Sequence, residues 1–470
     1  MLYNLLGLNT YIHWRDTMEF LAVPVPEKVA DFEKNGEFAR AVAEIDLMLE
    51  YASSAMLRQR LLWEKERLKR IEENYTYSSQ EALDLLSETF IDLSPEEFED
   101  LKKNKKLDSI IIDGREFYEK RFDKNLMFLD NSYEARLKEK DTIRSKNKTL
   151  LHEQIDRLSR NRNPLKFKVQ AGIYLRAKVG FQDETLRCWL PVPRVGDQIA
   201  AVTLLETSHE RYSLAPLASP QRTIFFEAPA EEGTEFSVKF EYEISEISCS
   251  FDPYTAEDID RSKFGNYLSE RAPHIVFTPY LRNLALEIAG TERNPYFIAK
   301  RFYEWICENV RYSFMSEYAL YDNLAEFAAV NLRGDCGVKA LLFITLCRIM
   351  GIPARWQSGW YATPISASPH DWALFWVEPH GWVPVDCSFG GARKDIPIYR
   401  DFYFGNLDAF RMVSNSAFMS PLSPVKKFYR FDPYDNQVGE IETDKRMFRS
   451  SWLEHELKIY SFDRLEEKEL

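Results

Sequence analysis

The sequence contains few cysteines, no excess of positive charge and no long apolar run, and each absence excludes a class of protein. Its six cysteines in 470 residues include no CxxC pair, which argues against a disulfide framework. A formal net charge of -13 argues against nucleic acid as the main partner, because phosphate contacts need a basic face. No apolar run approaches the length of a membrane span. We therefore expect no nucleic-acid partner and no membrane attachment.

The N-terminus also lacks the features of a signal peptide. Residues 1–8 have no basic region and only a short apolar run. The low cysteine content fits a reducing compartment, so we expect a cytoplasmic protein. Forty-five per cent apolar and 14 per cent aromatic residues indicate well-filled cores. A chain of this length is too long for one ordinary core, so several domains are predicted.

Residues 1–164 are predicted to form a helical N-terminal region. Apolar residues recur at spacings of three and four from Phe38 to Met56, as on one face of a long helix. Ser94 and Pro95 have the pattern of a helix start, and a charged helical stretch extends from about residue 133 to 160. Two interpretations stay open: a helical layer packed on the next domain, which we favour, or a module that docks a partner or gates a substrate.

A β-sandwich of the immunoglobulin-like type is predicted over residues 165–250. The apolar period changes from 3.6 to 2 at Leu165, and short alternating segments follow, separated by Gly, Pro, Asp and Ser clusters. These strands are expected at residues 167–176, 185–192, 200–206, 223–227 and 236–244. Their charged outer faces contain no catalytic cluster, so we interpret the sandwich as a scaffold or a recognition unit, the former being favoured.

A third domain is predicted over residues 264–420, followed by a C-terminal extension, 421–470, that packs on its core. Two amphipathic helices precede a more apolar helix that begins near Cys336 and ends before Gly351. Three strands are expected next, at residues 355–361, 370–377 and 382–386, the last two joined by a turn. The fold class is therefore α+β, with helices packed on an antiparallel sheet.

Cys336 lies where a loop becomes the apolar helix, between Gly334 and Gly337. The first turn of a helix has unsatisfied N–H groups and a partial positive charge, which lower the pKa of a thiol there. Lys339, one turn further on, is expected to add to this effect, and the glycines leave room for a substrate backbone. The alternative is a small core residue at a helix start, since cysteine is among the most often buried residues.

A cysteine nucleophile needs a base, and the base needs an acceptor that orients it. His370 begins one predicted strand and Asp386 ends the next, so a hairpin brings them to the same end. Asp371 should point to the opposite face of its strand from His370, and it is the second choice for the acid. His380 lies in the turn at the far end of the hairpin, and we reject it as the base. The remaining histidines are expected to be surface or capping groups: His13, His152, His209, His274 and His455.

The remaining cysteines are the next candidates for a metal site or a second reactive thiol. No pair of Cys or His residues has the spacing of metal ligands, so no metal site is predicted. Cys387 should face away from Asp386, its neighbour in the chain. Cys307 and Cys347 fall on apolar helix faces and are expected to be inert core residues.

Several short motifs in this domain resemble the transglutaminase-like superfamily of papain-type cysteine enzymes. The resemblance covers about residues 265 to 392, and more weakly Trp189-Leu190-Pro191-Val192-Pro193 of the sandwich. The motifs are Gly334-Asp335-Cys336-Gly337, Gly351-Ile352-Pro353-Ala354-Arg355, Ser358-Gly359-Trp360-Tyr361, His370-Asp371-Trp372-Ala373 and Trp382-Val383-Pro384-Val385-Asp386. The helix with Trp305 and the following Tyr312 also fit the family's lead-in. The N-terminal helices are not part of the resemblance.

The resemblance implies a papain-like fold and a catalytic triad. Cys336 would be the nucleophile, His370 the base and then the acid, and Asp386 the carboxylate that orients the histidine. The backbone N–H of Cys336 would stabilise the oxyanion, and the family's second oxyanion donor has no assigned residue here. Trp360, Trp372 and Gly337 are candidates for the wall of a substrate groove, although buried packing explains each tryptophan equally well.

The function predicted on this basis is a thiol peptidase or amidase that forms a thioester intermediate, acts on a peptide or protein substrate and needs no cofactor. Cross-linking is less favoured, because it requires the exclusion of water and because the sequence has no aspartate-rich calcium loop. The alternative is a catalytically silent transglutaminase-like domain that serves as a protein-binding scaffold. The sequence leaves the substrate and the oligomeric state open.

Overall fold

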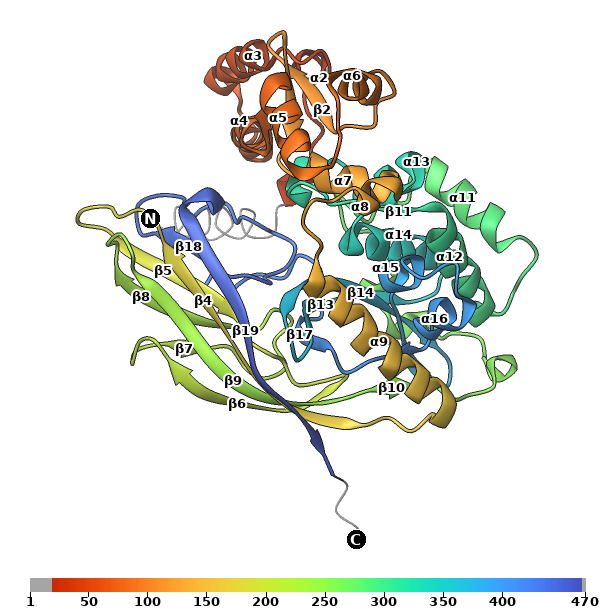
Figure 1. Ribbon diagram of the computed structural model, residues 1–470. Coiled ribbons are helices and arrows are strands. Elements are labelled where there is room, and N and C mark those ends of the chain that lie inside the picture. The colour runs from red at the N-terminus through yellow and green to blue at the C-terminus, as the bar shows by residue number, and fades with distance from the viewer. Residues whose placement is uncertain (1–18, 467–470) are drawn as a thin grey trace.

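The structure, a computed structural model, describes residues 19–466 and has three parts (Figure 1). An N-terminal region lies at the top of the view, a β-sandwich at the lower left, and a mixed helix-and-sheet core at the right. Helices and antiparallel sheets occur together, so the predicted α+β class is confirmed. The predicted lack of a signal peptide and the prediction for His13 concern residues outside the described range.

The N-terminal region is helical, as predicted, but it also contains a small three-stranded sheet in the order β1-β3-β2. Its helices are α2 (Glu27–Lys34), α3 (Phe38–Tyr51), α4 (Ala55–Asn74), α5 (Ser79–Thr89), α6 (Pro95–Lys103), α7 (Phe122–Leu129), α8 (Ser132–Ala135) and α9 (Thr142–Asn161). Its strands are β1 (Tyr75–Tyr77), β2 (Ser109–Ile112) and β3 (Arg115–Glu119).

The single long helix predicted from Phe38 to Met56 is wrong, because the chain breaks between α3 and α4. Ser54 caps the second helix by accepting a hydrogen bond from the backbone N–H of Leu57. The apolar spacing continues across the break because Phe38 and Ile45 of α3 and Leu61 of α4 line one buried cluster. Ser94 is the N-cap of α6, as predicted.

The sandwich has two four-stranded sheets, in the orders β18-β5-β8-β7 and β19-β4-β9-β6. The strands are β4 (Lys166–Ala177), β5 (Thr185–Pro191), β6 (Ile199–Thr207), β7 (Ser213–Leu214), β8 (Thr223–Pro229), β9 (Glu235–Ser245), β18 (Glu440–Thr443) and β19 (Leu453–Leu465). The C-terminal extension therefore supplies an edge strand to each sheet, beyond the packing on the core that the sequence predicted. Among the described residues, β19 pairs with β4 along almost its whole length, from Leu453 opposite Ala177 to Leu465 opposite Lys166.

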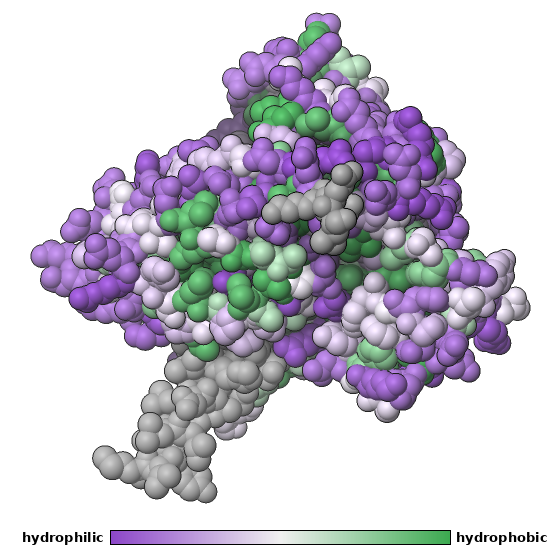
Figure 2. Space-filling view, turned by 90° about the horizontal axis from the view of Figure 1, so that it is seen from below, coloured by the Kyte–Doolittle hydropathy of each residue, from purple (hydrophilic) through white to green (hydrophobic). Residues whose placement is uncertain are grey.

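The sandwich and the core share one continuous hydrophobic cluster, which extends from Leu151 to Phe448. Figure 2 shows apolar side chains gathered on part of the face seen from below. Exposed large apolar residues of the sandwich are Leu205, Leu214 and Leu217. In the described part of the chain, no helix is both long and apolar enough to cross a membrane.

The core contains a further four-stranded antiparallel sheet, in the order β15-β14-β13-β17, with helices packed against it. Its helices are α10 (Gly265–Leu268), α11 (Pro279–Ala289), α12 (Pro295–Asn309), α13 (Leu324–Asn331), α14 (Cys336–Ile349), α15 (Cys387–Gly391) and α16 (Pro397–Phe402). Its main strands are β13 (Ala354–Ala362), β14 (Ala367–Val377), β15 (Gly381–Val385) and β17 (Arg411–Asn415). Shorter elements complete it: β10 (Ile247–Ser248), β11 (Arg311–Tyr312), the 3₁₀ helix η4 (Tyr318–Leu320), β12 (Arg333–Gly334) and β16 (Asn406–Leu407).

Helix α14 is the central helix of the core, since every residue from Gly337 to Arg348 is buried. A helix that is apolar on all sides can be stable only when it is surrounded by other elements. Asp335 caps its start by accepting a hydrogen bond from the backbone N–H of Val338, at 3.2 Å. Gly351 follows its end with φ of +74°, the left-handed conformation that glycine adopts readily. The sequence predicted a start near Cys336 and an end before Gly351, and both agree with the structure.

Candidate functional site

Cys336 is the first residue of α14 and keeps partial solvent exposure, whereas Cys188, Cys307, Cys347 and Cys387 are buried. The predicted core role of Cys307 and Cys347 is therefore confirmed. All six cysteines are unpaired. Cys336 is thus a partly exposed residue at the start of a buried helix.

The Cys336 thiol donates a hydrogen bond to Oδ2 of Asp371, with 3.3 Å between sulfur and oxygen. The backbone N–H of Asp371 also interacts with the sulfur. Within the described residues, no hydrogen bond joins the thiol to His370. The carboxylate that contacts the thiol is thus the one that the sequence ranked second for the role of acid.

The surroundings of the thiol are acidic. Burial raises the pKa of Cys336 well above its ordinary value, and the nearby carboxyl groups of Asp371 and Asp335 raise it further. This direction is opposite to the lowered pKa expected from the helix start, and burial is its largest cause. Lys339 does not compensate, since it is itself buried and interacts more strongly with Cys307, Cys387 and Asp386 than with Cys336.

His370 and Asp386 form a hydrogen-bonded pair in the buried interior. Nε2 of His370 and Oδ2 of Asp386 are 2.7 Å apart, and both side chains are buried. Oδ1 of Asp386 accepts hydrogen bonds from the backbone N–H groups of Ser388 and Phe389, at 3.0 and 2.9 Å. The hairpin of β14 and β15 brings the two residues together as expected, since Ala373 pairs with Val385 and Asp386 follows β15 directly.

Arg411 of β17 completes this pair, and sequence reasoning did not find it. Its Nη2 lies 3.0 Å from Oδ2 of Asp386 and 3.3 Å from Oδ2 of Asp408, with all three side chains fully buried. Burial alone would raise the pKa of Asp386, but His370 and Arg411 outweigh it and hold that pKa below its usual range. Arg411 reaches the site only because β17 pairs with β13, which no local pattern in the sequence indicates.

The imidazole of His370 is kept neutral by its surroundings. Burial lowers its pKa, and the opposing attraction of Asp386 does not fully offset this effect. When Nε2–H points to Asp386, the neutral ring carries its lone pair on Nδ1. That atom is then the one able to accept a proton from a nucleophile.

The two groups of side chains face different neighbours. The His370 ring stacks beside Trp372 and contacts Phe389, with centroid distances of 5.8 and 4.6 Å. Asp371, the next residue of β14, contacts Cys336 and Gln437 instead. Successive side chains of a strand point to opposite faces, so Asp371 and His370 point to opposite sides of β14.

The candidate groove residues are closely packed. Trp360 and Trp372 are buried, and their indole N–H groups donate to the backbone oxygen of Gln437 and to Oε1 of Gln357, each at 2.7 Å. A Cβ atom on Gly337 would lie 2.2 Å from the Tyr318 hydroxyl oxygen. These contacts correspond to the packing alternative for both tryptophans, and they give Gly337 a steric role beside the thiol.

His380 and His274 make their hydrogen bonds to groups other than the thiol. His380 stacks on Phe251 with a centroid distance of 4.1 Å and bonds to the Thr255 hydroxyl through Nε2 at 2.8 Å, at the far end of the hairpin. His274 is a buried capping group whose Nδ1 accepts from the backbone N–H of Leu324 at 3.2 Å. Both positions fit the roles predicted from the sequence. In the described part of the chain, no group of three or more His, Cys, Asp or Glu side chains could hold a metal ion.

Helix α7 of the N-terminal region packs against the segment that precedes the thiol (Figure 1). The Phe128 ring lies 4.9 Å from that of Tyr312 between centroids. Asn125 exchanges two hydrogen bonds with the backbone of Phe314, and Arg121 donates to the backbone oxygen of Met315. Tyr312 is close enough to Cys336 for a thiolate there to raise the pKa of its hydroxyl, which burial raises most. The helical region thus forms part of the wall around the thiol.

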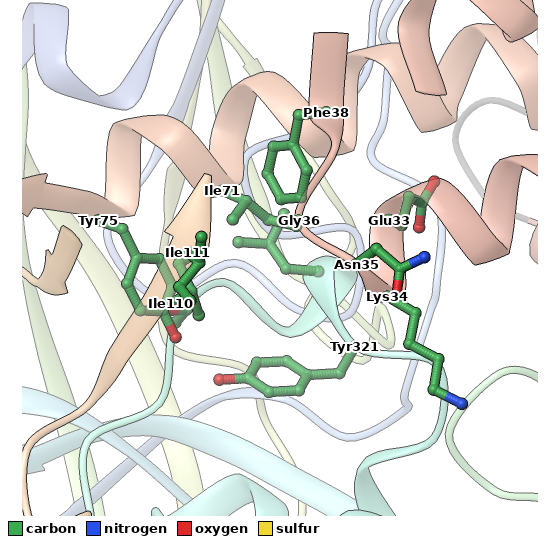
Figure 3. Close-up of a pocket in the computed structure, with 12 residues that line it drawn as sticks. Glu33, Lys34, Asn35, Gly36, Phe38, Ile71, Tyr75, Ile110, Ile111 and Tyr321 are labelled. Atoms are coloured by element: carbon green, nitrogen blue, oxygen red, sulfur yellow. The ribbon is translucent and has the colours of Figure 1, made fainter. Parts of the chain in front are cut away.

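Two cavities of about 440 and 580 Å³ lie between the N-terminal region and η4. Figure 3 shows Tyr321 on one side of the first cavity and Phe38 and Ile71 on the other. Neither cavity is lined by Cys336, His370 or Asp386. They are therefore features of the junction between the two parts and are separate from the thiol site.

Comparison with known proteins adds a family match. Residues 282–387, which include Cys336, His370 and Asp386, match the model of the transglutaminase-like superfamily. A candidate cysteine protease from Cytophaga hutchinsonii has 17% identity and a TM-score of 0.42, over 65% of this chain and 92% of its own. The periplasmic domain of TgpA from Pseudomonas aeruginosa has 15% identity and a TM-score of 0.27, over 52% and 94%. None of the curated proteins compared matches the chain.

Proposed function

We propose, from the match of residues 282–387 to the model of the transglutaminase-like superfamily, that this chain is a thiol enzyme that acts on peptide or carboxamide bonds. The observation that carries the proposal is the buried His370–Asp386 pair, 2.7 Å apart, in the same domain as a partly exposed cysteine at a helix start. Asp386 orients the imidazole, as the acid of a cysteine-enzyme triad does.

The reaction proceeds in two halves. Nδ1 of His370 takes the thiol proton, and the sulfur of Cys336 forms a bond to the carbonyl carbon of the substrate. The C–N bond then breaks, the leaving amine takes the proton from His370, and a thioester remains. Water activated by His370 attacks the thioester, the C–S bond breaks, and the proton returns to the thiolate. Hydrolysis is favoured over transfer to an amine, because cross-linking requires that water be excluded from the thioester.

The first helical N–H groups of α14 are suited to stabilise the oxyanion of each half-reaction. These groups have no acceptor within their own helix, and the partial positive charge of a helix start favours a developing negative charge. Peptide or protein chains are the substrates that this chemistry implies. Because all six cysteines are unpaired, we propose that the protein acts in a reducing compartment such as the cytoplasm.

Labelling with iodoacetamide tests whether Cys336 is a nucleophile. Cys249 is the matched control, because it is the only other partly exposed cysteine among the described residues. We expect Cys336 to react faster than Cys249 at neutral pH, as followed by peptide mass spectrometry. A Cys336 that reacts no faster than Cys249 would contradict the enzyme hypothesis.

Replacement of the nucleophile provides the second test. Cys336→Ala should abolish release of amine from peptide substrates, because no thioester can form. It should cost less than about 1 kcal/mol of stability, since the side chain is partly exposed. Thermal unfolding measured beside turnover separates the two effects, and a large fall in the melting temperature would favour a structural role.

A catalytically silent binding scaffold is the second candidate function. The observation in its favour is that the thiol contacts Asp371 in an acidic setting that disfavours the thiolate. A scaffold predicts that Cys336→Ala and the wild type bind the same partners and that neither releases product from peptides. Slow labelling of Cys336 together with unchanged binding would support it.

A further inference from the structure

The contact between Cys336 and Asp371 needs an explanation, because a carboxylate beside a thiol opposes thiolate formation. Asp371 has the sulfur 3.3 Å from its Oδ2, and both residues are held by their elements, the cysteine by α14 and the aspartate by β14. No rotation of the strand is needed to free the thiol. A turn about the Cα–Cβ bond of Cys336 is the simplest movement that ends the contact.

Asp371 is itself fixed by a residue from the other end of the chain. Nε2 of Gln437 donates to Oδ1 of Asp371 at 2.8 Å, and also to the backbone oxygens of His370 and Gly359, at 3.0 and 3.2 Å. The backbone oxygen of Gln437 accepts from the indole of Trp360 at 2.7 Å. Gln437 is therefore held through both its side chain and its backbone oxygen. Its side-chain amide orients Asp371 so that the second carboxylate oxygen lies toward the thiol.

The other titratable groups around this contact are mainly acidic. Asp335 caps α14, and Tyr318 donates to it at 2.5 Å. Asp435 and Asp432 of the C-terminal segment interact with Asp371, whose pKa is raised by burial and by these acids. Two more titratable groups interact electrostatically with the thiol: Tyr312 from β11 and Lys339 from the second turn of α14.

We propose that Asp371, oriented by Gln437, is a positioning residue that holds the Cys336 thiol in a protonated resting position and releases it toward His370 when substrate enters. This proposal rests on the proposed function and adds a step before it. The resting contact disfavours the thiolate and so slows, without abolishing, the reaction of the sulfur in the absence of substrate. His370 becomes the proton acceptor only after the thiol has turned away from β14's acidic side.

The test is the rate of alkylation of Cys336 by iodoacetamide in the full-length protein, measured from pH 6 to pH 9. Asp371→Asn keeps the size of the side chain and replaces the carboxyl group with an amide that cannot ionise. We expect it to increase the rate at pH 7.5 by about threefold or more, since a fall of one pKa unit raises the thiolate fraction tenfold and lowers its nucleophilicity in part. The midpoint of the pH profile should move to lower pH.

Asp371→Glu is the matched control, because it keeps the charge while it changes the length. Its rate should stay within about twofold of the wild type. A slower or unchanged rate in Asp371→Asn would overturn the proposal, since it would make Asp371 a base or an indifferent neighbour. Equal acceleration in both variants would also overturn it, because the effect would then come from altered packing.

Gln437→Met keeps the proposal testable if Asp371→Asn does not fold. It removes the donor that orients Asp371, so alkylation of Cys336 should again accelerate. An unchanged rate would show that Gln437 does not orient Asp371. Failure of the proposed function looks different. In that case neither the wild type nor any variant releases product from peptides, even where Asp371→Asn accelerates the labelling of Cys336.

Discussion

Arg411 is the only cation that contacts both Asp386 and Asp408 among the described residues, and all three side chains are fully buried. Its guanidinium also lies 4.1 Å from the centroid of the Phe389 ring. A buried carboxylate without a partner is costly, whereas the same carboxylate in a paired geometry is tolerated. The His370–Asp386 pair therefore depends on an arginine from a strand that does not neighbour either residue in sequence.

Arg411→Met should destabilise the fold by about 3–5 kcal/mol, because it leaves two buried carboxylates without their cation. Urea unfolding measures the loss. Arg160→Met is the matched control at a position where 76% of the side chain is exposed, and it should change the free energy of unfolding by less than about 0.5 kcal/mol. Equal stabilities of the two variants would contradict the role assigned to Arg411.

Gly337 is needed because the space beside the thiol is filled. A Cβ atom there would lie 2.8 Å from both Oδ2 of Asp371 and the Trp356 ring, in addition to its clash with Tyr318. Gly337→Ala should cost about 1–3 kcal/mol through overpacking. Gly265→Ala, where nothing lies within 4 Å of the new methyl group, should be neutral or stabilising in the same thermal unfolding experiment.

At the scale of elements, the sequence predicted the parts that local patterns determine. Helix α14, strands β13 to β15 and the first strands of the sandwich were predicted to within a few residues, because each has a clear apolar period and a cap or turn residue at its ends. The pairing of His370 with Asp386 also followed from the hairpin. The triad as a whole stays a prediction, since the thiol contacts Asp371.

The features missed around the site and at the edges of the sandwich depend on contacts between distant segments. Gln437 and Arg411 reach the site through the C-terminal segment and through β17, and their own neighbours in sequence give no sign of it. Strands β18 and β19 were missed because their pairing partners precede them by more than 200 residues. The acidic surroundings of the thiol were missed for the same reason.

The junction between α2, α4 and η4 contains a pH-dependent element. Glu33 of α2 lies beside Glu64 and accepts a hydrogen bond from Arg67 of α4, and Arg67 also donates to the backbone oxygen of Leu320 in η4 at 3.0 Å. Burial and then the charge of Glu64 raise the pKa of Glu33 to about 8. Glu33 thus binds a proton more tightly in the folded protein than in the unfolded chain.

A raised folded pKa makes stability fall as pH rises, here between the ordinary value of 4.5 and about 8. Glu33→Gln carries no such proton, so its advantage over the wild type should be absent near the lower limit and reach at most about 5 kcal/mol above the upper one. Urea unfolding at both pH values measures this difference. Glu99→Gln, at a position where 68% of the side chain is exposed, is the control, and an equal pH response in both variants would refute the assignment.

At the scale of the whole molecule, the N-terminal region and the C-terminal segment both pack on the parts of the chain between them. The N-terminal region packs on the segment before Cys336, and the C-terminal segment supplies an edge strand to each sheet of the sandwich. Arg70 of α4 joins both, since its guanidinium contacts Glu317 and the backbone oxygen of Arg430, each at 3.0 Å. The parts should therefore unfold together and not as independent domains.

Removal of β19 tests this dependence. A chain that ends at Trp452 leaves the long edge of β4 unpaired, and exposed edges of this kind promote aggregation. We expect little soluble protein on expression and no cooperative thermal transition. A synthetic peptide of residues 453–465, added during refolding, should restore part of the soluble fraction, and a truncated chain as soluble as the full one would contradict the prediction.

The origin of Gln437 near the end of the chain also sets the order in which the site can form during synthesis. Cys336, His370 and Asp386 all leave the ribosome before Gln437 and the strands that follow it. The surroundings of the thiol are therefore completed only after Gln437 has been synthesised. A nascent chain that stalls or is released early contains the three candidate catalytic residues without the amide that orients Asp371.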